Sequence, residues 1–176
     1  MKFAVTGYIA SGKDVLCNIL EKEGFKHISL SDILRQMLAK EGKEASRKNL
    51  TWLGNHLRQT KGDDVLAKNA LKQVDDSNWL VSSVGRVAEA QTLKQNGFKV
   101  IFVDAKQEIR YERVKKRNRK GDSLSFEAFK KQEELESKGG NKKFREFDNL
   151  KKEADIIISN NGSLKEFKEK IEELTI

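Results

Sequence analysis

Short apolar runs alternate along this chain with longer stretches in which apolar residues return every three or four positions. The short runs predict buried β-strands at 2–6, 26–30, 79–84, 99–104 and 155–159. The longer stretches predict helices at 13–23, 31–41, 47–59, 63–74, 87–96, 107–118, 124–137 and 163–174. Strands that alternate with helices favour an α/β fold, in which helices cover both faces of a parallel sheet.

The first strand is followed by a phosphate-binding loop. Residues 7–13 fit the pattern G-x-x-x-x-G-K, between the apolar run 3–5 and a helical stripe that begins at Val15. Glycines let the backbone curl round an anion with its N–H groups inward, and the new helix adds its positive end. Lys13 supplies a mobile cation for the outer phosphates. We therefore expect ATP to contact Gly7, Ala10, Ser11, Gly12, Lys13, Asp14 and Val15.

Position 14 departs from the usual pattern, which has Ser or Thr there to ligate Mg²⁺. Asp14 offers a hard carboxylate oxygen that can hold Mg²⁺ directly or through water. The alternative is that Asp14 complements the helix dipole in the first turn. Both interpretations stay open, and Asp14 is our candidate metal ligand.

Composition narrows the class of protein. The 176 residues are enough for a sizeable core in one domain, and no apolar run approaches the length of a membrane span. The N-terminus is read as strand and loop rather than signal peptide, and a lone cysteine, Cys17, excludes an internal disulfide. These features are typical of the cytoplasm. The net charge of +8 suits polyanionic ligands such as nucleotides, and it also suits nucleic acid.

Two segments do not fit the simple repeat of strand and helix. Residues 31–76 hold two or three helices between the second and third strands, and residues 110–153 are charge-rich and apolar-poor. The second segment carries several arginines and a glycine pair: Arg110, Arg113, Arg117, Arg119 and Gly139-Gly140. Such a segment beside a phosphate site is typical of a lid. Arg113 and Arg117 are four residues apart and lie on one helix face. This face either contacts phosphate or is simply exposed to solvent.

At this point the chain resembles P-loop kinases of the nucleoside monophosphate kinase superfamily. It is most similar to dephospho-CoA kinases and to small nucleotide kinases often labelled the same way. Residues 11–14 resemble the S-G-K-D loop of phage deoxynucleotide kinases and phosphomevalonate kinases. Residues 154–163 resemble the A-D-x-x-I-x-N-x-G-[ST] motif near the adenine site of dephospho-CoA kinases, which implies that Asn160 binds the nucleotide.

The resemblance also implies an acceptor side. Residues 29–35 resemble the segment that receives the acceptor nucleotide, which places Asp32 near the acceptor hydroxyl and Arg35 on its phosphate. Their alternatives are first-turn capping for Asp32 and solvation for Arg35. Residues 54–58 resemble G-N-x-L-R and residues 85–89 a shortened R-x-x-x-E element, which adds Arg58 and Arg86 as acceptor ligands. Many relatives end strand three with Asp-Gly, where this chain has Ser82-Ser83.

Together these features imply a P-loop NTPase fold, a three-layer α/β/α arrangement with a five-stranded parallel sheet. We expect one domain over 1–176, with an acceptor-binding helical insertion at 31–76 and a lid region at 113–150. The expected activity is transfer of the γ-phosphate of Mg-ATP to dephospho-CoA or a (deoxy)nucleoside monophosphate. Lys13, Asp32, Arg113 and Arg117 are the candidate catalytic residues.

Two alternatives to a kinase remain open. One is a P-loop ATPase that acts as an assembly or RNA-linked factor, in which the basic lid meets RNA phosphate. The other is nucleotide binding without catalysis, favoured by the missing Ser or Thr and the missing strand-three Asp. The chain is expected to act as a monomer or homodimer on small nucleotide substrates without a membrane.

Overall fold

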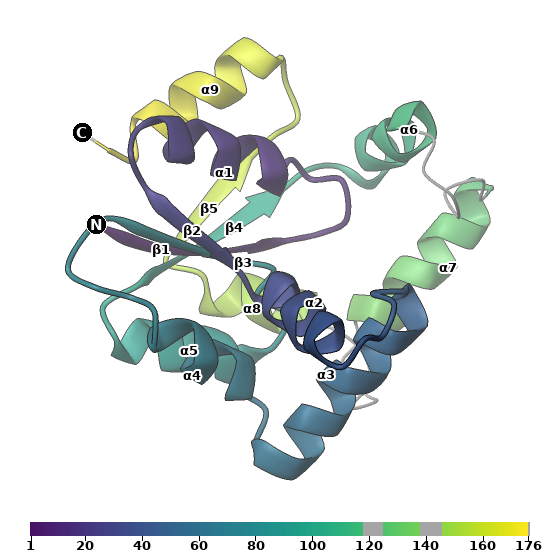
Figure 1. Ribbon diagram of the computed structural model, residues 1–176. Helices are drawn as coiled ribbons and strands as arrows, with labels where there is room; N and C mark the ends of the chain where they lie inside the picture. The colour runs from purple at the N-terminus through teal and green to yellow at the C-terminus, as the bar shows by residue number, and fades with distance from the viewer. Residues whose placement is uncertain (118–124, 138–145, 176) are drawn as a thin grey trace.

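The computed structural model describes residues 1–117, 125–137 and 146–175. Its centre is a parallel sheet in the order β2-β3-β1-β4-β5 (Figure 1). The strands are β1 (Lys2–Gly7), β2 (Lys26–Ser29), β3 (Trp79–Ser82), β4 (Lys99–Asp104) and β5 (Ile156–Ser159). This confirms the predicted five-stranded parallel sheet, with strand bounds that differ from the expected ones by at most two residues.

The strand register brings the functional segments to one edge of the sheet. Ala4 of β1 is level with Val81 of β3, and Ser29 of β2 is level with Ser82. Gly7, where β1 ends, is level with Val103 of β4. Because parallel strands end on the same side, the segments that follow β1, β2 and β3 converge there, which is where ligands of open α/β sheets bind.

One face of the sheet is covered by α1 (Lys13–Lys22) and α9 (Leu164–Glu172) (Figure 1). Leu16 and Leu20 of α1 pack with Phe167 and Ile171 of α9 in a cluster from which water is almost entirely excluded. The start of α9 is the predicted capping box, since the Ser163 hydroxyl accepts from the Glu166 N–H and the Glu166 carboxylate accepts from the Ser163 N–H.

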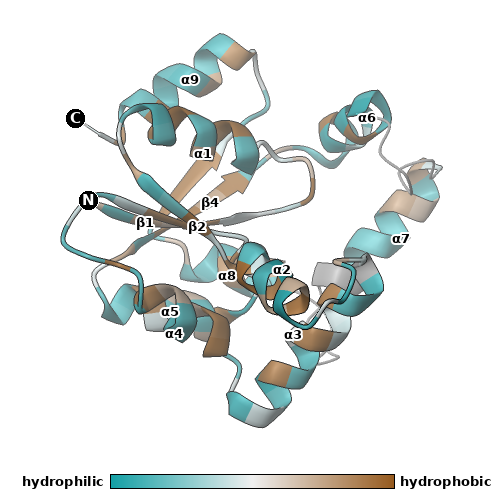
Figure 2. Cartoon of the chain, in the orientation of Figure 1, coloured by the Kyte–Doolittle hydropathy of each residue, from teal (hydrophilic) through white to brown (hydrophobic). Residues whose placement is uncertain are grey.

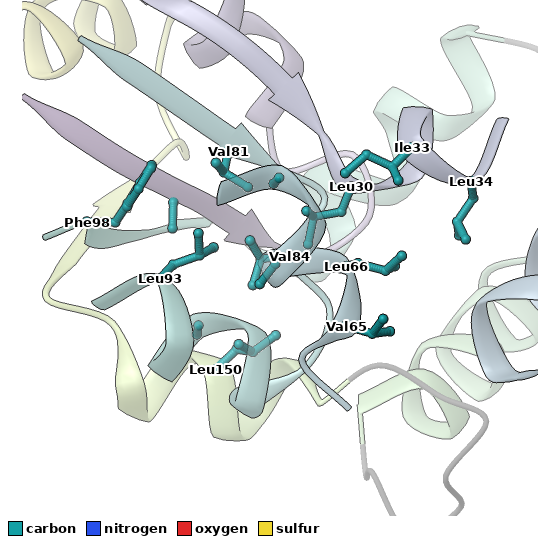
Figure 3. Packing of buried hydrophobic residues seen from close by; sticks show 14 of the residues in the cluster. Leu30, Ile33, Leu34, Val65, Leu66, Val81, Val84, Leu93, Phe98 and Leu150 are labelled. Atoms are coloured by element: carbon teal, nitrogen blue, oxygen red, sulfur yellow. The ribbon is translucent and has the colours of Figure 1, made fainter. Parts of the chain in front are cut away.

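The other face is covered by α4 (Val65–Leu71), α5 (Val87–Gln95) and α8 (Phe147–Glu153). The insertion between β2 and β3 also carries α2 (Leu30–Lys40) and α3 (Arg47–Lys61). Figure 3 shows Leu30 of α2 next to Val84, Ile33 further along the same helix, and Leu93 of α5 near Phe98, all in one apolar cluster. Figure 2 shows hydrophobic residues along the central strands and hydrophilic ones over much of α6 and α9.

Helix α8 was not predicted from the sequence. It has only seven residues, and Phe147 and Leu150 are its buried positions. Two apolar side chains among charged neighbours do not stand out as a helical stripe, because recognition of a period needs several turns. The helix forms because Phe147 and Leu150 fill the core beside β1 and β4.

The remaining helices are α6 (Gln107–Arg117) and α7 (Phe126–Ser137), which lie beside each other at one side of the sheet (Figure 1). A buried ion pair between Arg110 of α6 and Glu133 of α7 joins them. Parts of the expected lid region, including Arg119 and Gly139-Gly140, lie outside the described residues. Among the helices of the described ranges, none is long and apolar enough to cross a bilayer.

Candidate active site at the P-loop

The loop between β1 and α1 has the backbone conformation that its glycines permit. Gly7 and Gly12 have φ values of +141° and +112°, and Ala10 has +57°. A Cβ atom on Gly7 would lie 2.2 Å from the Val103 carbonyl oxygen, and one on Gly12 would lie 2.3 Å from Asn160 Nδ2. A larger residue at Gly7 would push the loop away from the β4 backbone, and one at Gly12 would displace the Asn160 side chain, so space as well as conformation favours glycine at both positions.

The polar groups of the loop suit a phosphate ligand. Lys13 Nζ donates to the carbonyl oxygens of Gly7 at 2.9 Å and Tyr8 at 2.6 Å. The Ser11 hydroxyl is buried and has no hydrogen-bond partner. A buried donor without a partner costs about 1–3 kcal/mol, so a small rearrangement that gave the hydroxyl a phosphate oxygen would be favourable. The residues present therefore fit ATP.

Asn160 supports the loop from behind. Its Nδ2 donates to the Ser11 carbonyl at 2.7 Å, and its backbone N–H donates to the Asp104 carbonyl at 2.7 Å. The side chain is buried and does not line the cavity described below. In this conformation Asn160 holds the phosphate-binding loop against the ends of β4 and β5, and its contact with the nucleotide stays a prediction.

Arg113 of α6 contacts the same loop from another side. Its Nη2 donates to the Asn160 backbone carbonyl at 3.0 Å, and its Nη1 lies 3.4 Å from the carbonyl oxygens of Ala10 and Ser11. Burial, and then the neighbouring Arg110 guanidinium, lower the pKa of Arg113. The side chain remains a cation at neutral pH because arginine starts from so high a value. A positive charge therefore lies directly beside the loop.

The loop opens into a cavity of about 680 Å³, within the size range of small-molecule sites. Its walls come from the P-loop and α1, the ends of β2 and β3, the start of α2, and α6 and α7. Nine of the candidate site residues line it: Ala10, Gly12, Lys13, Asp14, Val15, Asp32, Arg35, Arg113 and Arg117. Gly7 and Ser11 belong to the loop without lining the cavity.

Asp32 and Arg35 form an ion pair on the first turns of α2. Both side chains are about half exposed, and Arg35 Nη1 also donates to the Ser31 hydroxyl at 3.3 Å. The helix begins at Leu30, so Asp32 lies inside the first turn and its carboxylate is shared with Arg35. This pair occupies the wall of the cavity that lies on α2, whereas Lys13 and Asp14 occupy the wall on α1.

Arg58 and Arg86 do not line the cavity. Arg58 of α3 donates to Glu89 of α5 at 2.8 Å, and the Glu89 side chain is fully buried. The other Glu89 oxygen accepts from the N–H groups of Gly85 and Arg86 at 2.9 and 3.1 Å. Burial, followed by repulsion from Arg58, lowers the pKa of Arg86. An acceptor-binding role for these two arginines stays a prediction.

The sequence reasoning did not assign roles to several polar residues that line the cavity. The hydroxyls of Ser29, Ser31 and Ser83 lie 2.8–3.2 Å from one another at the ends of β2 and β3. His27 also lines the cavity and bonds Ser82. The available signal was the replacement of Asp-Gly by Ser82-Ser83, but the contact with His27 depends on strand register, which the sequence does not give.

The cavity offers limited protein ligands for a metal. Within the described ranges, no three His, Cys, Asp or Glu side chains lie together. Asp14 is exposed at the cavity wall next to Lys13. A single carboxylate is compatible with Mg²⁺, which keeps several waters and takes further oxygens from substrate phosphates. The donor set therefore fits Mg²⁺ that arrives with a nucleotide.

Comparison with known proteins shows which families this chain belongs to. The model of a family described as "AAA domain" matches residues 4–139. A UPF0200 protein of Sulfurisphaera tokodaii is 34% identical over 175 residues, which cover 97% of this chain and 93% of that protein. A UPF0200/UPF0201 protein of Archaeoglobus fulgidus is 29% identical over 98% of this chain, which spans only 54% of that longer relative.

Solved structures show the same fold at low identity. Shikimate kinase from Bacteroides thetaiotaomicron has a TM-score of 0.63 at 13% identity, over 99% of this chain and 96% of its own. Dephospho-CoA kinase from Campylobacter jejuni has a TM-score of 0.59 at 21% identity, with the same coverage. The P-loop kinase-like fold is thus confirmed, whereas the nearest kinase family stays a prediction. The chain belongs to the AAA domain family and, by its archaeal relatives, to the UPF0200 family.

Proposed function

We propose that the protein is an ATP-dependent phosphotransferase whose acceptor is a small nucleotide-like molecule, either dephospho-CoA or a (deoxy)nucleoside monophosphate. The observation that carries this proposal is the shared cavity. Lys13 and Asp14 line it on the P-loop side, and Asp32 and Arg35 line it on the α2 side. Such an arrangement holds donor and acceptor in one space, and positioning is most of what phosphoryl transfer asks of a protein.

The donor side would hold the phosphates of ATP. The loop N–H groups and Lys13 neutralise the outer phosphates, for which Lys13 exchanges the carbonyl oxygens of Gly7 and Tyr8 for phosphate oxygens. Asp14 would hold Mg²⁺, which neutralises phosphate charge when it is bound with ATP. Arg113 and Arg117 supply further positive charge from α6, which also lines the cavity.

The acceptor side would depend on Asp32 and Arg35. In the free protein the two side chains pair with each other, so neither is left as an isolated charge. An acceptor phosphate takes over the Arg35 guanidinium, and this exchange frees the Asp32 carboxylate. With dephospho-CoA, Asp32 then orients or accepts the proton of the sugar hydroxyl. A nucleoside monophosphate offers a phosphate oxygen and needs no base.

The test is ADP release from Mg-ATP in the presence of dephospho-CoA and each common nucleoside and deoxynucleoside monophosphate. One acceptor is expected to stimulate release. Lys13→Ala is expected to lower the stimulated rate about a hundredfold or more, because it removes the cation nearest the outer phosphates. Lys22→Ala is the matched control, since Lys22 lies in the last turn of the same helix and does not line the cavity.

The outcomes separate the proposal from its alternatives. Full stimulated activity in Lys13→Ala would contradict the assignment of the P-loop. ATP binding without stimulation by any acceptor would contradict the phosphotransferase proposal and favour an ATPase that serves assembly or RNA. Steep salt dependence of RNA binding would then be the next measurement.

A further inference from the structure

Three side chains, from α1, β2 and β3, form a chain of hydrogen bonds that the proposed transfer reaction does not use. His27 Nε2 lies 2.7 Å from the Ser82 hydroxyl, and His27 Nδ1 lies 2.8 Å from Glu21 Oε1. Ser82 ends β3, His27 is in β2 and Glu21 is in α1. A hydroxyl bonded to an imidazole that is oriented by a third group is the arrangement of an activated nucleophile.

With a neutral imidazole, the Glu21 carboxylate assigns the direction of these bonds. An ionised carboxylate only accepts, so His27 Nδ1 carries the proton that it shares with Glu21. In the neutral ring, Nε2 then has a free lone pair, and the Ser82 O–H donates to it. The imidazole is therefore set to take the Ser82 proton, and Glu21 stabilises the charge that results.

This chain of side chains opens onto the same cavity as the P-loop. Ser82 and His27 line the cavity together with Lys13 and Asp14. On α1, Asp14, Cys17 and Asn18 face the cavity, and Glu21 continues that face one turn on. Val81 of β3 is level with Ala4 of β1. Ser82 follows Val81 and is therefore one residue nearer than Val81 to the carboxyl ends of the strands, where the phosphate-binding loop begins.

We propose that Ser82 is a phosphoryl acceptor in its own right, so that the protein phosphorylates itself at Ser82 when ATP is bound without a second substrate. The proposal rests on the ATP binding of the proposed function. Ser82 Oγ forms a bond to the γ-phosphorus, and the bond from that phosphorus to the bridging oxygen breaks. ADP leaves with the electron pair, and His27 Nε2 takes the Ser82 proton. The products are phospho-Ser82, ADP and a protonated His27 paired with Glu21.

A solely structural role would give the same contacts, because a half-buried histidine commonly joins a strand to a helix. What distinguishes the two is reactivity toward ATP. The experiment incubates the full chain with Mg-[γ-³²P]ATP and no acceptor, and measures ATP binding in parallel. We expect an acid-stable label, a gain in intact mass of one phosphoryl group, and a modified peptide that maps to Ser82.

Variants separate the chemistry from folding. Ser82→Ala is expected to abolish the label, and Ser159→Ala, outside the cavity at the end of β5, to retain it. His27→Gln keeps a polar side chain but provides no base, and is expected to slow labelling about a hundredfold. Glu21→Gln is expected to slow labelling about tenfold. The control is Glu23→Gln, at the exposed end of the same helix, which is expected to leave the labelling rate unchanged. Thermal unfolding of each variant establishes that it is folded.

Several results would overturn the proposal. A protein that binds ATP and gains no label would overturn it, even if acceptor-dependent ADP release were intact. An acid-labile label, or one that maps to a residue other than Ser82, would overturn it as well. An unchanged rate of labelling in folded His27→Gln would show that the imidazole is not the base. Failure to bind ATP at all would overturn this proposal and the proposed function together.

Discussion

Single residues of the phosphate-binding loop are held by partners that lie far away in the sequence. Asn160 of the β5 end bonds the Ser11 carbonyl, and Arg113 of α6 bonds the Asn160 carbonyl. Lys13 is held over the carbonyl oxygens of Gly7 and Tyr8. The loop is thus ordered before a ligand arrives, which lowers the entropy that binding must overcome.

We predict that loss of Arg35 weakens the binding of the acceptor and leaves the binding of ATP unchanged. Arg35→Ala removes a guanidinium from the α2 wall of the cavity. The KM for the acceptor is expected to rise about ten- to hundredfold, which corresponds to a charge-assisted hydrogen bond of about 1.5–3 kcal/mol. Lys40→Ala, in the last turn of α2, is the control. Steady-state kinetics check this, and a rise in the KM for ATP with no change for the acceptor would contradict it.

At Cys17 we predict a dependence of stability on alkaline pH. Burial, assisted by the Asp14 and Glu21 carboxylates, raises the pKa of the Cys17 thiol from 9.0 to about 12. Because the folded protein disfavours the thiolate, this contribution to stability is complete below pH 9.0 and is lost as the pH rises toward 12. The decrease in Tm between pH 8 and pH 10.5 is expected to be larger than in Cys17→Ala.

Thiol reactivity gives a second measure of the same group. Cys17 is the one cysteine of the sequence, so a thiol reagent reports on it alone. At pH 8 the reaction is expected to be slow in the folded protein and fast in denaturant, since the thiolate is the reactive form. Equal rates in the two states, or equal pH dependence of Tm in Cys17→Ala, would show that the thiol is not buried as described.

Among the elements, α3 and α5 are joined by the buried pair of Arg58 and Glu89. Glu89 also caps the start of α5 through the N–H groups of Gly85 and Arg86. Loss of the carboxylate would leave the Arg58 guanidinium without its charged partner. This guanidinium is largely buried and already has an unpartnered Nε. Glu89 therefore connects the helical insertion to α5, whatever Arg58 does for an acceptor.

We predict that Glu89→Ala lowers the free energy of unfolding by about 3–5 kcal/mol, the usual cost of breaking one partner of a buried pair. Urea denaturation checks this. The double variant Arg58→Met with Glu89→Leu is expected to recover part of the loss, because it removes the unpaired Arg58 charge but leaves the Gly85 and Arg86 N–H groups without their acceptor. A loss below about 1 kcal/mol in Glu89→Ala would mean that the pair does not hold α3 to α5.

The sequence predicted every strand and helix that the structure describes except α8. All five strands and eight helices were predicted near their observed places, because each carries an apolar run or stripe that is long enough to recognise. Helix α8 was missed because two buried positions, Phe147 and Leu150, are too few for a period. Tertiary packing decides such short helices.

For the site, the sequence predicted the loop and both walls of the cavity but not the contacts between them. Lys13, Asp14, Asp32 and Arg35 could be named because each lies in a local motif. The bond between His27 and Ser82 and the pair of Arg58 and Glu89 join residues 55 and 31 positions apart. Such contacts depend on register and helix packing, for which a single sequence carries no local signal.

At the scale of the whole molecule, charge and shape agree with an enzyme for polyanions. The net charge of +8 favours approach of nucleotides. The topology brings the P-loop, the α2 pair and the α6 arginines to one edge of the sheet, around a cavity of about 680 Å³. A donor and an acceptor phosphate would both meet positive charge there.

The proposed reaction transfers phosphate to an acceptor rather than to water. The most direct measurement follows the label from [γ-³²P]ATP after incubation with Mg²⁺ and the acceptor panel, and separates the products chromatographically. We expect the label to appear in one phosphorylated nucleotide-like product, which is lost in Lys13→Ala and retained in Lys22→Ala. Label found only in inorganic phosphate, with every acceptor, would contradict it.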